Sequence, residues 1–122
     1  MVLNINQALI KRATEKALKD SVLGLSAYIT TEVISSNRPW PEPLGTRDIV
    51  DDGGLRSSQR VNEVSPEEYQ IAWTVEYALF VHEGYTLPNG TRIPGRPFAQ
   101  IGLDEFDVED AFAKSFRRTI GD

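Results

Sequence analysis

The chain has 122 residues, 40% of them hydrophobic, which is enough for one hydrophobic core but short for two. It contains no cysteine, so disulfide bridges and thiolate metal sites are excluded. Its formal net charge of −5 argues against general affinity for nucleic acid, because binding to phosphates needs clustered lysine and arginine.

The sequence predicts a single domain, residues 1–122, without a membrane segment. Its first residues lack the basic segment and apolar run of a secretory signal, and no apolar run approaches the ~20 residues that span a bilayer. Charge is unevenly distributed, since residues 67–110 contain nine acidic side chains but only two basic ones, Arg92 and Arg96. Such a run is either an ordinary solvated surface or a surface that repels phosphate.

A long amphipathic helix is predicted for residues 1–35. Asn4 and Gln7 resemble a capping box, and apolar residues then recur three and four positions apart as far as Val33. A continuous helix over residues 5–35 would be ~45 Å long, and a glycine within it is a candidate kink. Four small residues let another backbone approach closely, from the same chain or from a neighbouring subunit: Ala13, Ala17, Ser21 and Gly24.

A loop rich in proline and glycine is predicted for residues 36–54. Its prolines exclude helix, and Asp51-Asp52-Gly53-Gly54 is typical of a turn. Two strands are predicted next, at residues 55–64 and 69–75, with the apolar residues of the second strand on one face.

The remaining elements are a short helix, a hairpin and a last helix. The short helix covers residues 76–83 and ends at Gly84, and Asn89-Gly90 predicts a hairpin with Leu87 near its tip. Asp107 is placed to cap a C-terminal helix over residues 108–120. The predicted class is α+β, with a long N-terminal helix and a C-terminal helix packed on a small antiparallel sheet that extends a β-hairpin arm.

No catalytic constellation is recognisable, and we expect neither enzymatic activity nor a cofactor. His82 is the only histidine and lacks the second histidine that a zinc peptidase helix requires, so a partly buried or interface position is expected for it. Two clusters of acidic residues are the remaining candidates for a metal-assisted hydrolase: Asp48, Asp51 and Asp52, and Asp104, Glu105 and Asp107. Turn formation also explains the first cluster, and helix capping also explains the second.

Two segments together resemble the head-tail joining proteins of long-tailed bacteriophages, a family also described as neck, tail-completion or minor tail proteins. The first is Asp51-Asp52-Gly53-Gly54-Leu55-Arg56-Ser57-Ser58, and the second is Tyr77-Ala78-Leu79-Phe80-Val81-His82-Glu83-Gly84 followed by Gly95-Arg96-Pro97-Phe98. That family shows an Asp-Thr-Gly, Leu-Arg turn, then a helix with Tyr-Ala, Val-Glu and Gly, then Arg-Pro-Phe and a terminal helix. The resemblance covers about residues 51–120.

The resemblance implies a structural virion protein, a subunit of a homo-oligomeric ring that joins tail to head around the DNA channel. Six-fold symmetry is expected because phage tails are six-fold as a class, and twelve-fold symmetry is the alternative. The partners would be other copies of the chain and neighbouring neck and tail proteins. DNA would pass without specific binding, and the location would be the virion, with assembly in the host cytoplasm.

Several residues are expected to organise assembly. The glycine turn would aim Leu55 and Arg56, the apolar residues of the short helix would hold it to the sheet, and Arg96 would pair with an acid such as Glu83. The alternative is that the aromatic residues only build the monomer core. The complete set is Gly53, Gly54, Leu55, Arg56, Tyr77, Phe80, Val81, Glu83, Gly84, Leu87, Asn89, Gly90, Arg96, Pro97 and Phe98.

The hairpin around Asn89-Gly90 is expected to be an exposed arm that could bind a neighbouring subunit by strand addition. A different hypothesis makes the chain a small non-catalytic adaptor that binds proteins through this hairpin and the proline loop at Trp40. Genome neighbourhood separates the two hypotheses, since tail and portal genes beside this one would favour the ring subunit.

Overall fold

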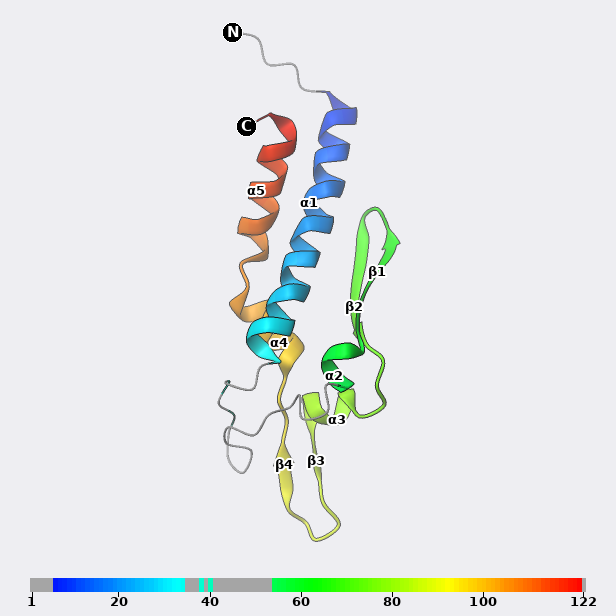
Figure 1. Cartoon of the computed structure of the whole chain (residues 1–122), viewed down its shortest axis with the longest axis vertical. Coiled ribbons are helices and arrows are strands. Elements are labelled where there is room, and N and C mark those ends of the chain that lie inside the picture. The colour runs from blue at the N-terminus through cyan, green and yellow to red at the C-terminus, as the bar shows by residue number, and fades with distance from the viewer. Residues whose placement is uncertain (1–5, 35–37, 39, 41–53, 122) are drawn as a thin grey trace.

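The computed structural model describes residues 6–34, 38, 40 and 54–121. The class is α+β, as predicted, and the strands form two antiparallel two-stranded sheets, β1–β2 and the β3–β4 arm (Figure 1). No helix of these residues is long and apolar enough to cross a membrane. The elements in chain order are α1 (Gln7–Tyr28), the π-helical turn η1 (Ile29–Val33), α2 (Gly54–Ser57), β1 (Gln59–Ser65), β2 (Glu68–Trp73), α3 (Ala78–Glu83), β3 (Gly84–Thr86), β4 (Arg92–Pro94), α4 (Phe98–Glu105) and α5 (Val108–Ile120).

The long N-terminal helix is confirmed as α1 and its continuation η1. Its N-cap is Asn6, whose side chain accepts a hydrogen bond from the Leu9 amide at 2.8 Å, whereas Asn4 lies outside the described residues. The helix is continuous across Gly24, and a Cβ there would lie 2.9 Å from the ring of Phe106. The glycine therefore makes room for the segment between α4 and α5.

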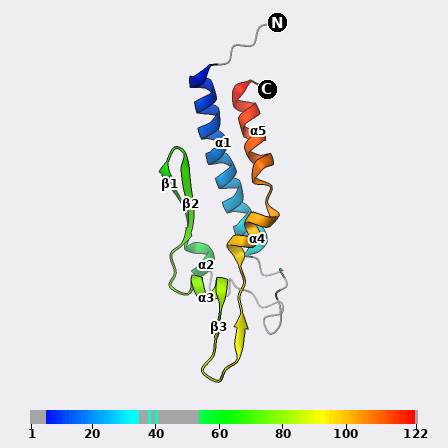
Figure 2. The same ribbon diagram turned by 180° about the vertical axis from the view of Figure 1, so that it is seen from behind.

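Helix α5 returns along α1, and the two lie side by side in both opposite views (Figures 1 and 2). Ala13, Ala17 and Ser21 of α1 are buried, as is Ser115 of α5, whose hydroxyl donates to the Asp20 carboxylate at 2.7 Å. The small residues of α1 predicted that another backbone approaches it closely, and that backbone is α5 of the same chain. Asp107 caps α5 as expected, because its side chain accepts from the Asp110 amide.

The hydrophobic core lies at the C-terminal end of α1, where α2, α3 and α4 meet it. A Cβ on Gly102 of α4 would lie 2.4 Å from the Ile29 side chain, so the backbone of α4 packs directly on that side chain. The hairpin β1–β2 lies along α1 on the side away from α5, with Val61 opposite Ile71 in its register (Figure 2). The buried hydrophobic cluster is Leu25, Ile29, Val33, Ile34, Trp40, Leu55, Ala78 and Phe98.

The prediction of strand for residues 55–58 was wrong, because Gly54–Ser57 form the short helix α2. The hydroxyls of Ser57 and Ser58 donate to the carbonyls of Gly54 and Leu55, which gives the backbone an alternative to strand pairing. Only Leu55 of this segment enters the core, and strand β1 begins at Gln59. Helix α4, Phe98–Glu105, is an element that the sequence did not predict.

Replacing Ser115 with alanine should destabilise the chain by about 1.5 kcal/mol, because it removes a hydrogen bond to a charged carboxylate. That bond is the main cause of the lowered pKa of Asp20, and Lys16 lowers it further. Since the pKa is lower in the folded state, Asp20 stabilises the fold above about pH 4 and this contribution is lost as the pH falls through the lowered pKa. Urea unfolding from pH 7 to pH 3 should show a shallower pH dependence in Ser115→Ala.

The matched control is Thr14→Ala, which removes an exposed hydroxyl that bonds to a carbonyl of its own helix. Its stability should change with pH as that of the unmodified chain does. The same pH dependence in Ser115→Ala and the unmodified chain would contradict the role assigned to the bond between Ser115 and Asp20.

Candidate assembly surfaces

The turn at Gly53-Gly54 is described only from Gly54 onward, and Gly53 lies outside the described residues. Leu55 is fully buried in the core, and Ser58 donates its amide to the Gly54 carbonyl. The guanidinium of Arg56 donates to the carbonyl of Ile34, directly after η1. The cation lies at the C-terminal end of η1, where it satisfies a free carbonyl and is favoured by the helix dipole. Leu55, through its burial, and Arg56, through this bond, therefore both stabilise the monomer.

The short helix α3 does not bury all its apolar residues. Val81 packs against the core, but the expectation that Tyr77 and Phe80 also hold the helix down was wrong, because these side chains are 39% and 58% exposed. Leu79 is more exposed still, at 66%. A helix has only one face toward the core, so four consecutive apolar residues must leave some in solvent.

The exposed side chains of α3 continue onto β3. The ring of Phe80 meets that of Tyr85 edge to face, with centroids 6.5 Å apart. Leu87 directly follows β3 and is also exposed. We call the exposed large apolar side chains of α3, its N-cap, β3 and the residue after it the α3–β3 patch: Tyr77, Leu79, Phe80, Tyr85 and Leu87.

Glu83, the acid suggested as a partner of Arg96, does not pair with it. The Glu83 carboxylate lies 2.8 Å from Nδ1 of His82, while Arg96 is buried with its guanidinium 5.9 Å from the centre of the Trp40 ring. Cation–π attraction is strengthened by such burial. Trp40 is also buried, so it does not offer the contact surface that the adaptor hypothesis gave it.

The segment Arg96-Pro97-Phe98 anchors the return of the chain, as expected. The Arg96 amide donates to the Val81 carbonyl at 2.7 Å, and Pro97 is the N-cap residue of α4. Phe98 is only 2% exposed and meets both Trp73 and His82 edge to face. His82 is partly buried, as expected, and its ring packs on this anchor.

The β3–β4 hairpin projects from the end of the molecule as an arm (Figure 1). Its loop contains three residues, because the Leu87 amide bonds to the Thr91 carbonyl and the Gly90 amide bonds to the Leu87 carbonyl. Gly90 has a φ of +88°. The Asn89-Gly90 pair therefore predicted the position of the hairpin correctly. Only the glycine of the pair has a positive φ, which is typical of a three-residue loop with a glycine bulge.

Gly84 joins α3 to this arm and has a φ of +82°. A Cβ at this position would lie 2.5 Å from the carbonyl oxygen of Ile93 on the neighbouring strand. Gly84 ends the helix as predicted, and it also allows β3 and β4 to pair immediately afterwards.

The carboxylates near α4 have separate structural partners. The pKa of Glu105 is lowered first by hydrogen bonding to Arg38, at 2.6 Å, and then by the hydroxyl of Tyr28. Asp104 accepts from Gln100, and Asp107 caps α5. Within the described residues, no three histidine or acidic side chains are grouped to hold a metal ion. The cluster at Asp48 lies outside them.

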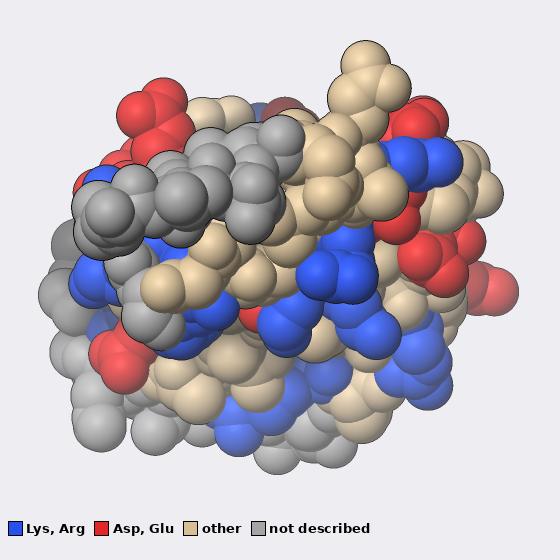
Figure 3. Space-filling view, turned by 90° about the horizontal axis from the view of Figure 1, so that it is seen from above, with Lys and Arg blue, Asp and Glu red and all other residues tan. Residues whose placement is uncertain are grey.

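Charge is separated along the molecule. Lysine and arginine gather over the end formed by the N-terminal half of α1 and the C-terminal half of α5, seen from above in Figure 3. Some of them are paired on their own helix, Lys16 with Asp20 and Lys114 with Asp110. The basic side chains at this end are Lys11, Arg12, Lys16, Lys19, Lys114, Arg117 and Arg118. The acid-rich segment around α4 and the start of α5 lies farther down the molecule.

Several exposed apolar residues were not predicted from the sequence. Leu79 and Tyr85 belong to the α3–β3 patch, and Leu103 of α4 is 55% exposed. The signal was present for Leu79, because α3 is apolar on every face although only one face can be buried. No helix was predicted around Leu103, so it could not be predicted which side chains of this segment would be exposed.

No family model, curated protein or solved structure matches the chain.

Replacing Gly84 with alanine should destabilise the chain by about 3 kcal/mol, because it adds a clash with the Ile93 carbonyl to the cost of positive φ. Replacing Gly90 with alanine should cost only about 1 kcal/mol, since a Cβ there meets nothing within 4 Å. Urea unfolding of both variants measures this difference. Equal losses of stability would show that the close approach at Gly84 has no energetic importance.

Proposed function

We propose that the chain is a structural virion protein of a bacteriophage head-tail junction, where it forms a homo-oligomeric ring as a neck or tail-completion subunit. Copies of the chain and adjacent neck and tail proteins are its partners. The observation that carries the proposal is the α3–β3 patch, an apolar surface left in solvent beside a projecting arm. Large exposed apolar patches mark protein interaction sites.

Two further observations support the proposal. The motif order from Gly54 to Phe98 resembles the head-tail joining family, and part of that motif builds the core while the rest lies on the patch. The β3–β4 arm has only three residues in each strand, and isolated two-stranded hairpins are marginally stable in water. Contact with a neighbour would stabilise this arm.

The charge distribution is compatible with a position around DNA. The acid-rich segment carries Asp104, Asp107, Glu109 and Asp110 on exposed positions. A channel lined by such residues would repel phosphate and let DNA pass, because phosphate binding requires clustered cations. The basic end of the α1–α5 pair would then lie away from the channel surface.

A small protein-binding adaptor is the second candidate, and the same patch favours it. The adaptor would present the α3–β3 patch to a different protein and would remain monomeric by itself. The ring subunit would present the patch to another copy or to a neighbouring virion protein. The two functions therefore differ in where the chain is found and in what its loss prevents.

Deletion of the gene from its phage genome should produce separate heads and tails, which electron microscopy of lysates distinguishes from complete particles. Expression of the chain in trans should restore joined particles. Complete, infectious particles that lack the chain would contradict the proposed function.

The variant Phe80→Ser should fail to restore joined particles, because it removes the centre of the apolar patch. It should not lower the free energy of unfolding by more than about 1 kcal/mol, since Phe80 is 58% exposed. The matched control is Val64→Ser, which changes a residue 53% exposed on the other hairpin and should restore joining. Restoration by Phe80→Ser at the level of the control would exclude the patch as an assembly surface.

A further inference from the structure

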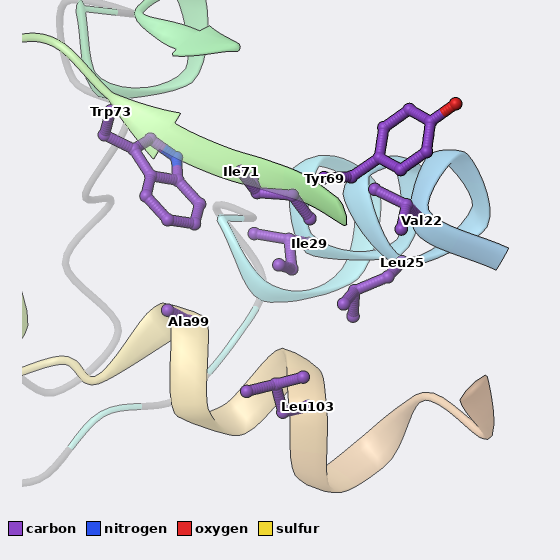
Figure 4. Close-up of a pocket in the computed structure, with 8 residues that line it drawn as sticks. All are labelled: Val22, Leu25, Ile29, Tyr69, Ile71, Trp73, Ala99 and Leu103. Carbon is purple, nitrogen blue, oxygen red and sulfur yellow. The ribbon is translucent and has the colours of Figure 1, made fainter. Parts of the chain in front are cut away.

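An apolar groove of about 270 Å³ runs between α1, β2 and α4 (Figure 4). The inner face of β2 forms one wall and α4 forms the other, with the side of α1 between them. The groove is partly open to solvent. Its lining consists of Val22, Leu25, Ile29, Tyr69, Ile71, Trp73, Ala99 and Leu103.

The groove suits apolar side chains rather than a polar ligand. The indole nitrogen of Trp73 already donates to Gln59 at 3.1 Å, and the hydroxyl of Tyr69 already donates to Glu63 at 3.0 Å. The other lining side chains have no polar atoms. An occupant would therefore gain binding energy from burial of apolar surface, with few new hydrogen bonds.

The chain cannot fill this groove with its own α3–β3 patch. Only four residues separate the end of β2 from the start of α3, and the Ala78 amide bonds to the Val75 carbonyl within them. In both opposite views α3 and the arm lie beyond the lower end of β2 (Figures 1 and 2). Contact between the two surfaces must therefore join different copies.

The area of the patch matches one side of a stable protein interface. At about 200 Å² for each large side chain, the exposed fractions of its five residues correspond to roughly 480 Å² of mainly apolar surface. A standard interface buries about 800 Å² on each partner, of which about 57% is apolar, or roughly 450 Å².

We propose that the α3–β3 patch of one copy docks in the α1–β2–α4 groove of the next copy. This inference rests on the proposed function, and it assigns the contact by which the ring subunits join. Because the patch and the groove are different surfaces, each copy keeps its other surface available after the first contact. Head-to-tail contacts of this kind form a ring when the rotation between copies closes, whereas a two-fold contact stops at the dimer.

The absence of cysteine makes a direct cross-linking test possible. Leu79→Cys places a thiol on the patch and Leu103→Cys places one on the rim of the groove, at positions that are 66% and 55% exposed. One variant carries a size tag, and the two are mixed and oxidised. The expected product is a disulfide-linked heterodimer in at least about tenfold excess over the control mixture, because docking raises the local concentration of the two thiols.

The control mixture pairs Leu79→Cys with Ile10→Cys, which is 38% exposed on the N-terminal part of α1, far from the groove. A chain carrying both Leu79→Cys and Leu103→Cys should give a ladder of linked copies on oxidation. Urea unfolding of each reduced variant, with a free energy near that of the unmodified chain, shows that the fold is kept.

Two results would overturn the inference. One is equal cross-linking in the test and control mixtures, and the other is oxidation of Leu79→Cys mainly with itself, which indicates a two-fold contact. The deletion experiment separates this inference from the proposed function. If joining requires the chain but the two thiols do not link, the groove contact is wrong and the ring subunit remains.

Discussion

The close approach of other segments to α1 is the constraint on which the rest of the structure depends. Ala13, Ala17 and Ser21 give α5 room on one side, and Gly24 gives room to the ring of Phe106. Near the end of the helix, Gly102 brings the backbone of α4 against Ile29. A larger side chain at any of these positions would push α4 or α5 away from α1 and loosen the packing between them.

A fold organised around one long helix leaves surfaces that the monomer does not cover. Helix α5 covers one side of α1 and the β1–β2 hairpin covers another, while the groove between β2 and α4 stays open. At the other end, α3 is held by Val81 and the anchor at Phe98 but turns Leu79 and Phe80 to solvent. One apolar hollow and one apolar projection on the same chain are what a repeating head-to-tail contact requires.

The sequence predicted the elements whose signals are local. The three-four periodicity located α1, Asp107 located the start of α5, and Asn89-Gly90 located the arm. It failed where tertiary contacts decide, as at Leu55, where one turn of helix places a single side chain in the core. It also failed at Arg96, because nothing local shows that the side chain lies over Trp40. The division of apolar residues between core and patch in α3 depends on what α3 packs against, which periodicity over six residues does not reveal.

The central claim is that copies of this chain form a ring where the phage head meets the tail. Electron cryomicroscopy of the junction in purified virions tests it most directly, at a resolution that distinguishes side chains. The account predicts a closed ring of copies around the DNA, with Leu79 and Phe80 of each copy against a neighbouring protein and not in solvent. A junction map in which every density is assigned to other proteins would contradict it.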